Sequence, residues 1–208
     1  MFENLAAFVA VSAVVICVPG PDTALIVRNT VTGGRRSGIA TAVGIIGGIA
    51  VWTVAAALGL AALLSASEPV FRALQLAGAA YLVFLGLQSL ASAFSRRSGR
   101  LARVSVGGGR LEPSRALRQG LLSNLGNPKI AVFFVSLVPQ FVAPGSDSFL
   151  ALLALGGIFS AMGLAWLTLY AVLVAKAGEL LRGRARRAID AITGAVLIAF
   201  GFRMAVER

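Results

Sequence analysis

The stretch VICVPGPDTALIV, residues 15–27, interrupts an apolar segment with two prolines, a glycine and an aspartate. Proline and glycine are the poorest helix formers, and a charged side chain is costly inside an apolar segment. Glycine is accepted at the position before a helix, however, and proline is favoured at the first helical position. The triplet Gly20–Pro21–Asp22 therefore predicts that one helix ends near Pro19 and that a second helix begins at Pro21.

The composition indicates a membrane protein. The chain has 208 residues, of which 58% are hydrophobic and 13% are charged, whereas soluble proteins are about 45–50% apolar and about 25% charged. Six apolar segments can each reach the roughly 20 residues that span a bilayer: 5–27, 37–67, 73–95, 119–141, 148–175 and 188–202. The segments lack the alternation of barrel strands. We therefore predict an all-α integral membrane protein with six transmembrane helices.

Lysine and arginine predict the orientation. The connections after the first, third and fifth segments hold most of the 19 basic residues, and basic loops face the cytoplasm. This rule also accounts for the net charge of +11 without a nucleic acid partner. We expect a membrane protein with lipid as its solvent, with both termini outside and with the three basic loops in the cytoplasm.

The chain is predicted to be a single membrane transport domain, 1–208. Its first three-helix half is 1–95, a basic cytoplasmic loop follows at 96–118, and the second half is 119–208. Because each half has an odd number of spans, the halves have opposite orientations, as in the 3+3 inverted repeats of secondary transporters.

The first segment of the second half carries a matching interruption. Asn127–Pro128–Lys129 has a good helix-capping residue followed by proline. Helices 1 and 4 are therefore both predicted to be broken at mid-membrane, where the free N–H groups of two helix starts could bind a carboxylate. Lys129 could pair with Asp22 or with a substrate carboxylate. A purely structural ion pair and simple proline kinks remain alternative readings.

Four glycines at and within the second segment form two pairs, Gly34 with Gly38 and Gly44 with Gly48, at the four-residue spacing that permits close helix contact. We interpret them as helix-packing residues, either against the first segment or against a neighbouring copy in a homodimer, and a direct role in substrate binding is the alternative reading.

The sequence resembles the LysE-type amino acid exporters, which include lysine exporters and homoserine/threonine resistance translocators. The resemblance rests on PGPD at 19–22, GRRSGIATAVG at 34–44 and NPKIAVFF at 127–134. It implies a secondary transporter of the bacterial inner membrane, with both termini in the periplasm, that exports amino acids or related small metabolites and is driven by the proton-motive force. The family motifs match Pro19, Gly20, Pro21, Asp22, Asn127, Pro128 and Lys129. In this reading Asp22 couples protons, Asn127 helps hold the substrate carboxylate, and Lys129 supplies a counter-charge.

Other classes fit less well. The chain has no histidine and one cysteine, Cys17, so we expect no structural zinc, no resident cofactor and no dithiol electron carrier. We expect no enzyme activity. A cation or metal exporter, which could use Asp22, and a non-transporting membrane subunit remain as alternatives.

Overall fold

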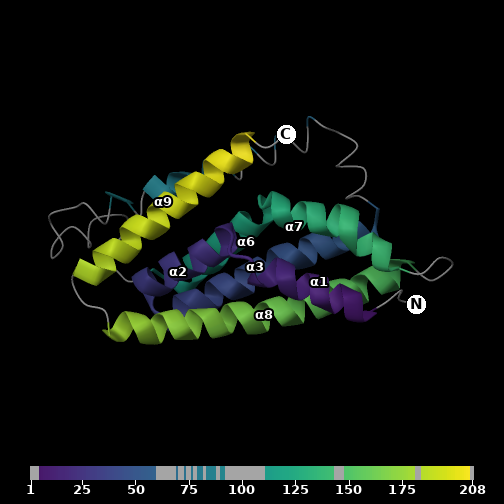
Figure 1. Cartoon of the computed structure of the whole chain (residues 1–208), viewed down its shortest axis with the longest axis horizontal. Helices are drawn as coiled ribbons and strands as arrows, with labels where there is room; N and C mark the ends of the chain where they lie inside the picture. Colours follow the sequence, from purple (N-terminus) through teal and green to yellow (C-terminus); the bar gives the residue numbers. More distant parts are fainter. Residues whose placement is uncertain are drawn as a thin grey trace.

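The structure, a computed structural model, describes residues 5–59, 111–142, 148–180 and 184–206, with separate positions at 69, 73, 76, 79–81, 83–87, 90 and 91. The elements along these ranges are helical (Figure 1). They are α1 (Leu5–Cys17), α2 (Pro21–Gly33), α3 (Arg35–Ala57), α6 (Pro113–Leu125), α7 (Pro128–Val132), the π-helical turn η1 (Phe133–Leu137), the 3₁₀ turn η2 (Val138–Phe141), α8 (Ser148–Leu180) and α9 (Arg184–Val206).

Two of these helices, α3 and α8, are each long and apolar enough to cross a membrane. The pair α1–α2 and the run from α6 to η2 also qualify if each is counted as one bent span, which gives up to four spans in the described residues. About half of the predicted third span, 73–95, lies outside the described residues, and its described positions are helical. The six-span, 3+3 arrangement stays a prediction.

Both predicted helix breaks are confirmed. The axis bends by 51° between α1 and α2 and by 55° between α6 and the helical run that begins at Pro128. Each new helix starts with proline at its first position, after Gly20 in one case and Asn127 in the other. Proline can occupy this position because the first N–H groups of a helix have no intrahelical acceptor.

Two expectations about the basic connections were wrong. The helix α6 begins at Pro113, so the end of the predicted loop 96–118 is helical. The second helix of the first segment continues to Gly33, so Arg28 lies on α2 and is buried rather than in a cytoplasmic connection. Its guanidinium donates to the side chains of Asn29 (3.2 Å) and Gln119 (3.4 Å), whose carbonyl oxygens make burial of the charge tolerable.

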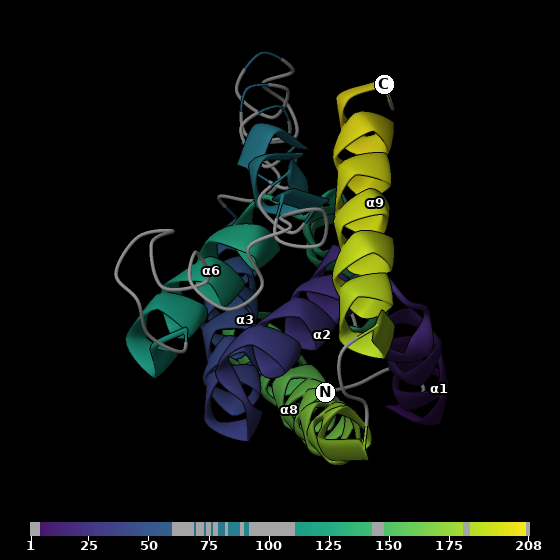
Figure 2. The same ribbon diagram turned by 90° about the vertical axis from the view of Figure 1, so that its left-hand side faces the viewer.

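The helix α3 is central and packs against α6 on one side and α8 on the other, as the end view in Figure 2 shows. Glycines permit the contact with α6. A Cβ at Gly44 would collide with the backbone of Leu117, and a Cβ at Gly120 would collide with the backbone of Thr41. This close approach places the side chains of α6 directly against α2 and α3.

An aromatic cluster closes one end of the core between α1, α8 and the helical run after Pro128. The ring of Phe8 packs edge-on against Phe141 at 5.4 Å, and Phe133 and Phe134 lie 4.7 and 5.4 Å from Phe159. The rings of Phe8, Phe134 and Phe159 are essentially fully buried. Their packing fixes the segments that flank both breaks.

Candidate functional site

The two helix breaks lie against each other at the middle of the fold. The carboxylate of Asp22, in the first turn of α2, is buried with 9% of its surface exposed. It accepts hydrogen bonds from Ser123 Oγ (3.1 Å), Asn124 Nδ2 (2.9 Å) and Asn127 Nδ2 (3.1 Å). All three donors come from α6 or from the break that follows it. Neutral donors can hold a buried carboxylate in place and leave its charge uncompensated.

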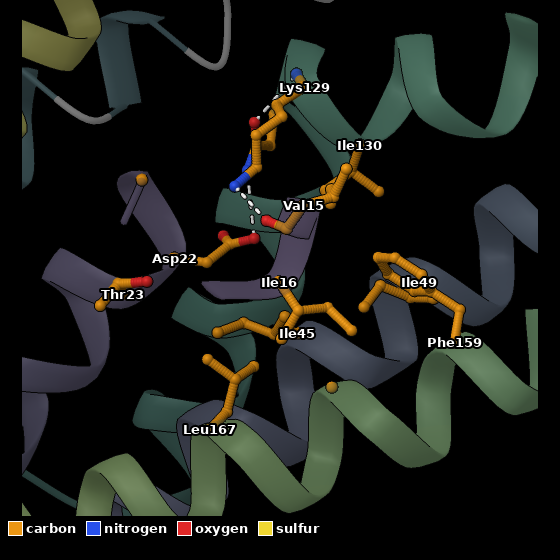
Figure 3. A pocket seen from close by; sticks show the side chains of 13 residues that line it. Val15, Ile16, Asp22, Thr23, Ile45, Ile49, Lys129, Ile130, Phe159 and Leu167 are labelled. Carbon is orange, nitrogen blue, oxygen red and sulfur yellow. Dashed lines mark hydrogen bonds between the residues drawn. The ribbon is translucent and has the colours of Figure 1, made fainter. Parts of the chain in front are cut away.

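Lys129 lies in the opposite break but does not form an ion pair with Asp22. Its ammonium group donates to two backbone carbonyl oxygens of the first break, Val15 at 2.9 Å and Val18 at 3.0 Å. The carboxylate and the ammonium are thus each held by other groups (Figure 3). This geometry disfavours the alternative of a structural ion pair between the two charges.

The side chain of Asn127 is engaged at both ends. Its Oδ1 accepts the backbone N–H of Lys129 at 3.1 Å, as a helix N-cap does, and its Nδ2 donates to Asp22. The backbone oxygen of Asn127 accepts the N–H groups of Ile130 and Ala131, both at 3.1 Å. Asn127 therefore orients Asp22 with one of the two hydrogens of its Nδ2, and its contact with a substrate carboxylate stays a prediction.

The two helix starts differ in whether a side chain caps their first amide groups. The first amides of α7 are taken up by Asn127, whereas α2 has no side-chain cap at its N-terminus. At the start of α2 the backbone N–H of Ala24 donates to the carbonyl oxygen of Gly20 at 3.0 Å, as in an ordinary helical turn. The amides of α2 are thus better placed than those of α7 to meet an anionic group.

A narrow pocket opens beside the breaks, with a volume of about 40 Å³. By this measure it has space for about two or three water molecules. Asp22 and Lys129 are its charged groups, and Gly20, Thr23 and Asn127 also line it. The rest of the wall is largely apolar: Val15, Ile16, Ile45, Ile49, Ile130, Phe159, Gly163 and Leu167. In Figure 3 the side chains of Ile16, Ile45, Ile49, Phe159 and Leu167 lie below the two charges, while Val15 and Ile130 lie beside them.

The remaining predicted residues have separate places. Pro19 ends the first helix, while Pro21 and Pro128 begin the second helix at each break. Of the four predicted packing glycines, Gly34 is the turn between α2 and α3 with φ 79°, a conformation that favours glycine. The other three lie on α3: Gly38 against Thr30 and Ala171, Gly44 against Leu117, and Gly48 against Asn124. The first segment is thus only one of several surfaces that the glycines contact.

Sequence reasoning did not find Ser123 and Asn124. Both are buried and both donate to Asp22. A signal was present, because Asn124 and Asn127 are three residues apart in an apolar segment, a spacing that can bring two side chains to one face. Asn29 was also missed; it is fully buried and donates to Thr41 Oγ1 at 3.0 Å, which joins α2 to α3.

The family resemblance is confirmed by comparison with known proteins. The family model described as LysE type translocator matches residues 13–208. The chain belongs to the LysE type translocator family. This LysE-type chain is 30% identical to the threonine efflux protein of Escherichia coli (strain K12), over 95% of each chain. It is 28% identical to the homoserine/homoserine lactone efflux protein of Salmonella typhimurium, over 100% of this chain and 98% of that protein.

A further relative is an uncharacterized membrane protein of Pseudomonas aeruginosa, 34% identical over 92% of this chain and 89% of that protein. No solved structure matches the LysE-type chain. Family and relatives identify it as a transporter rather than an enzyme, and as an exporter of a small molecule. It is a multi-pass membrane protein with apolar helices.

Proposed function

We propose that this protein exports neutral amino acids across the bacterial inner membrane. The observation that carries the proposal is a pocket lined by a carboxylate and an ammonium that are not paired with each other. An amino acid is a zwitterion, so its ammonium group matches Asp22 and its carboxylate matches Lys129 and the first amides of α2. Opposite charges arranged in this way select for both ends of the substrate at once.

The apolar wall of the pocket supports a neutral side chain, and the pocket must widen at the breaks to hold a whole amino acid, because its volume is only about 40 Å³. Its wall is formed largely by branched aliphatic residues and one phenylalanine, with Thr23 as the hydroxyl. A second charge on the substrate would be buried there without a partner, at a cost of several kcal/mol. The names of two relatives, a threonine efflux protein and a homoserine/homoserine lactone efflux protein, agree with a small polar or apolar side chain.

We propose that the proton-motive force drives export and that Asp22 is the proton-binding group. It is a buried carboxylate that borders the pocket, so a proton and a substrate ammonium can compete for the same oxygen atoms. Intramembrane carboxylates typically serve proton relays in transporters. The proposal includes six spans in a 3+3 inverted repeat, with both termini in the periplasm and the basic connections in the cytoplasm.

The test is efflux from cells that overproduce the protein and are preloaded with labelled amino acids. We expect faster efflux of threonine, homoserine or another neutral amino acid, and unchanged efflux of lysine and glutamate. A protonophore should abolish the increase. Equal stimulation of lysine or glutamate efflux would contradict the pocket assignment, and export that persists with protonophore would contradict proton coupling.

A further inference from the structure

One carbonyl group at the end of α1 lacks its helical hydrogen-bond donor. The helical series of hydrogen bonds continues as far as Val18, whose N–H donates to Val14 at 3.0 Å. The next donor in the series would be the N–H of residue 19, directed at the carbonyl of Val15. Residue 19 is proline and has no N–H. The carbonyl of Val15 is therefore left without its helical donor, and an unbonded backbone carbonyl in an apolar environment is costly.

The ammonium of Lys129 takes the place of this donor. It lies 2.9 Å from the Val15 oxygen and 3.0 Å from the Val18 oxygen, although Lys129 is more than a hundred residues away along the chain. A cation at the C-terminus of a helix interacts favourably with the helix dipole, whereas a cation in the first turn of a helix does not. The position of Lys129 is unfavourable for its own helix, α7, and favourable for α1.

The geometry points to Lys129 as a C-cap that α7 supplies to α1, and to release of this cap by the carboxylate of the substrate. The second part rests on the proposed function. An ammonium has three hydrogen-bond donors, and two are used on carbonyls. It borders the pocket beside Gly20, where a Cβ would lie 3.4 Å from Nζ.

A carboxylate forms stronger bonds with an ammonium than a neutral carbonyl does, because both partners are charged. A substrate carboxylate in the pocket therefore draws Lys129 away from Val15 and Val18. The end of α1 then loses the bonds that replaced its missing N–H, and the 51° break between α1 and α2 becomes free to change its angle. Substrate occupancy is in this way linked to the break in the first segment. Lys129 acts as a positioning residue of α1 as well as a contact of the substrate.

The protein carries its own reporter for this link. Cys17 is the only cysteine of the chain, it is the last residue of α1, and it is exposed. A nitroxide label on Cys17 of the purified full chain reports the mobility of the break by electron paramagnetic resonance. The first comparison uses no ligand, and size-exclusion chromatography confirms that each variant is folded.

We expect Lys129→Met to lose the immobilised component of the spectrum and Lys129→Arg to retain it. Adding Pro19→Ala to Lys129→Met should restore it, because alanine returns the N–H that the Val15 carbonyl lacks. Pro21→Ala is the matched control, since it returns a donor to the carbonyl of Cys17, which Lys129 does not contact. An unchanged spectrum in Lys129→Met, or equal recovery with both proline substitutions, would overturn the cap.

The second comparison adds L-threonine or L-threoninol, which has a hydroxymethyl group in place of the carboxylate. We expect threonine to mobilise the label in the unsubstituted protein, threoninol to leave it unchanged, and Lys129→Met to show no response. Export of threonine without mobilisation, or mobilisation by both compounds, would overturn the coupling. If the efflux panel finds no exported amino acid, the proposed function and the coupling fall together. The cap is then still decided by the ligand-free spectra.

Discussion

Replacing Gly48 with alanine tests whether α3 controls the hydrogen bonds of Asp22. Gly48 faces Asn124 across the contact between α3 and α6. A Cβ at Gly48 would lie 2.6 Å from Asn124 Oδ1, 2.8 Å from its Cβ and 3.0 Å from its Cγ. Gly47 on the same helix is the matched control, because its Cβ would meet only Leu121 Cδ1, at 3.5 Å.

The size of the effect follows from what can move. The backbones of α3 and α6 are in direct contact at Gly44 and Gly120, so the helices cannot separate locally without losing this packing. Rotation of the Asn124 side chain relieves the contacts with Oδ1 and Cγ, and the contact with Cβ at 2.8 Å requires a small shift of α6 as well. Both movements take Asn124 Nδ2 away from its 2.9 Å bond to Asp22. A hydrogen bond to a charged group contributes about 1.5–3 kcal/mol. At 1.4 kcal/mol for each tenfold change, export should fall roughly tenfold to a hundredfold.

The assay is the initial rate of amino acid efflux, divided by the amount of the variant in the membrane. Gly48→Ala should lower this ratio, while Gly47→Ala should leave it near the unsubstituted value. Shortening the neighbour in Gly48→Ala with Asn124→Ser should restore only part of the rate, because serine removes the collisions with Oδ1 and Cγ but keeps the one with Cβ. Equal rates per molecule for the two glycine variants would refute the link from α3 through Asn124 to the carboxylate.

Further predictions concern the charges, the helix contact and the orientation. Asp22→Asn should abolish proton-coupled export while the protein stays in the membrane, since an amide cannot exchange the proton; normal efflux with normal pH dependence would disprove this role. Asp22→Asn combined with Lys129→Met should likewise stay in the membrane without exporting, and recovered efflux would show that the two charges only neutralise each other. Gly44→Ala should remove most of the protein from the membrane on immunoblots, because its Cβ would collide with the backbone of α6; normal abundance would contradict the contact. In a cysteine-free background, a periplasmic thiol reagent should label a cysteine at Ser67 and miss one at Ser98, and the reverse would overturn the orientation.

The helix breaks could be predicted from the sequence because their causes are local. Proline at the first helical position and glycine or asparagine before it are properties of a few adjacent residues. The start of α6 follows only the proline part of this rule, because Pro113 is its first residue but Glu112 precedes it. The sequence predicts a later start for this helix, because Arg115 and Arg118 are counted with the basic loop. The composition of a segment indicates that it can span the membrane, but it does not fix where its helix begins.

The partners of the two charges could not be predicted, because they depend on how separate helices meet. Asp22 and Lys129 occupy matching positions and carry opposite charges, so a direct pair is the simplest reading of the sequence. The structure instead assigns Asp22 to donors of α6 and Lys129 to carbonyls of α1. The close contact between α3 and α6 determines which polar groups of α6 face Asp22. That contact is set by glycines whose partners no local pattern reveals.

The double engagement of Asn127 has an evolutionary consequence. Its Oδ1 is committed to a backbone N–H, so its other end must be a donor, and the residue opposite it must be an acceptor. Asn127→Asp would keep the cap of α7 but set two carboxylates against each other. Exchanging the two residues, with asparagine at 22 and aspartate at 127, would not repair this, because Asn124 and Asn127 donate to the same oxygen of Asp22. Whichever way the amide at 22 turned, either the Asn124 amide or the carboxylate at 127 would lose its bond. The choice of residue at each of the two positions is thus held in place by a third side chain, and a paired change between 22 and 127 does not lead to a second functional sequence.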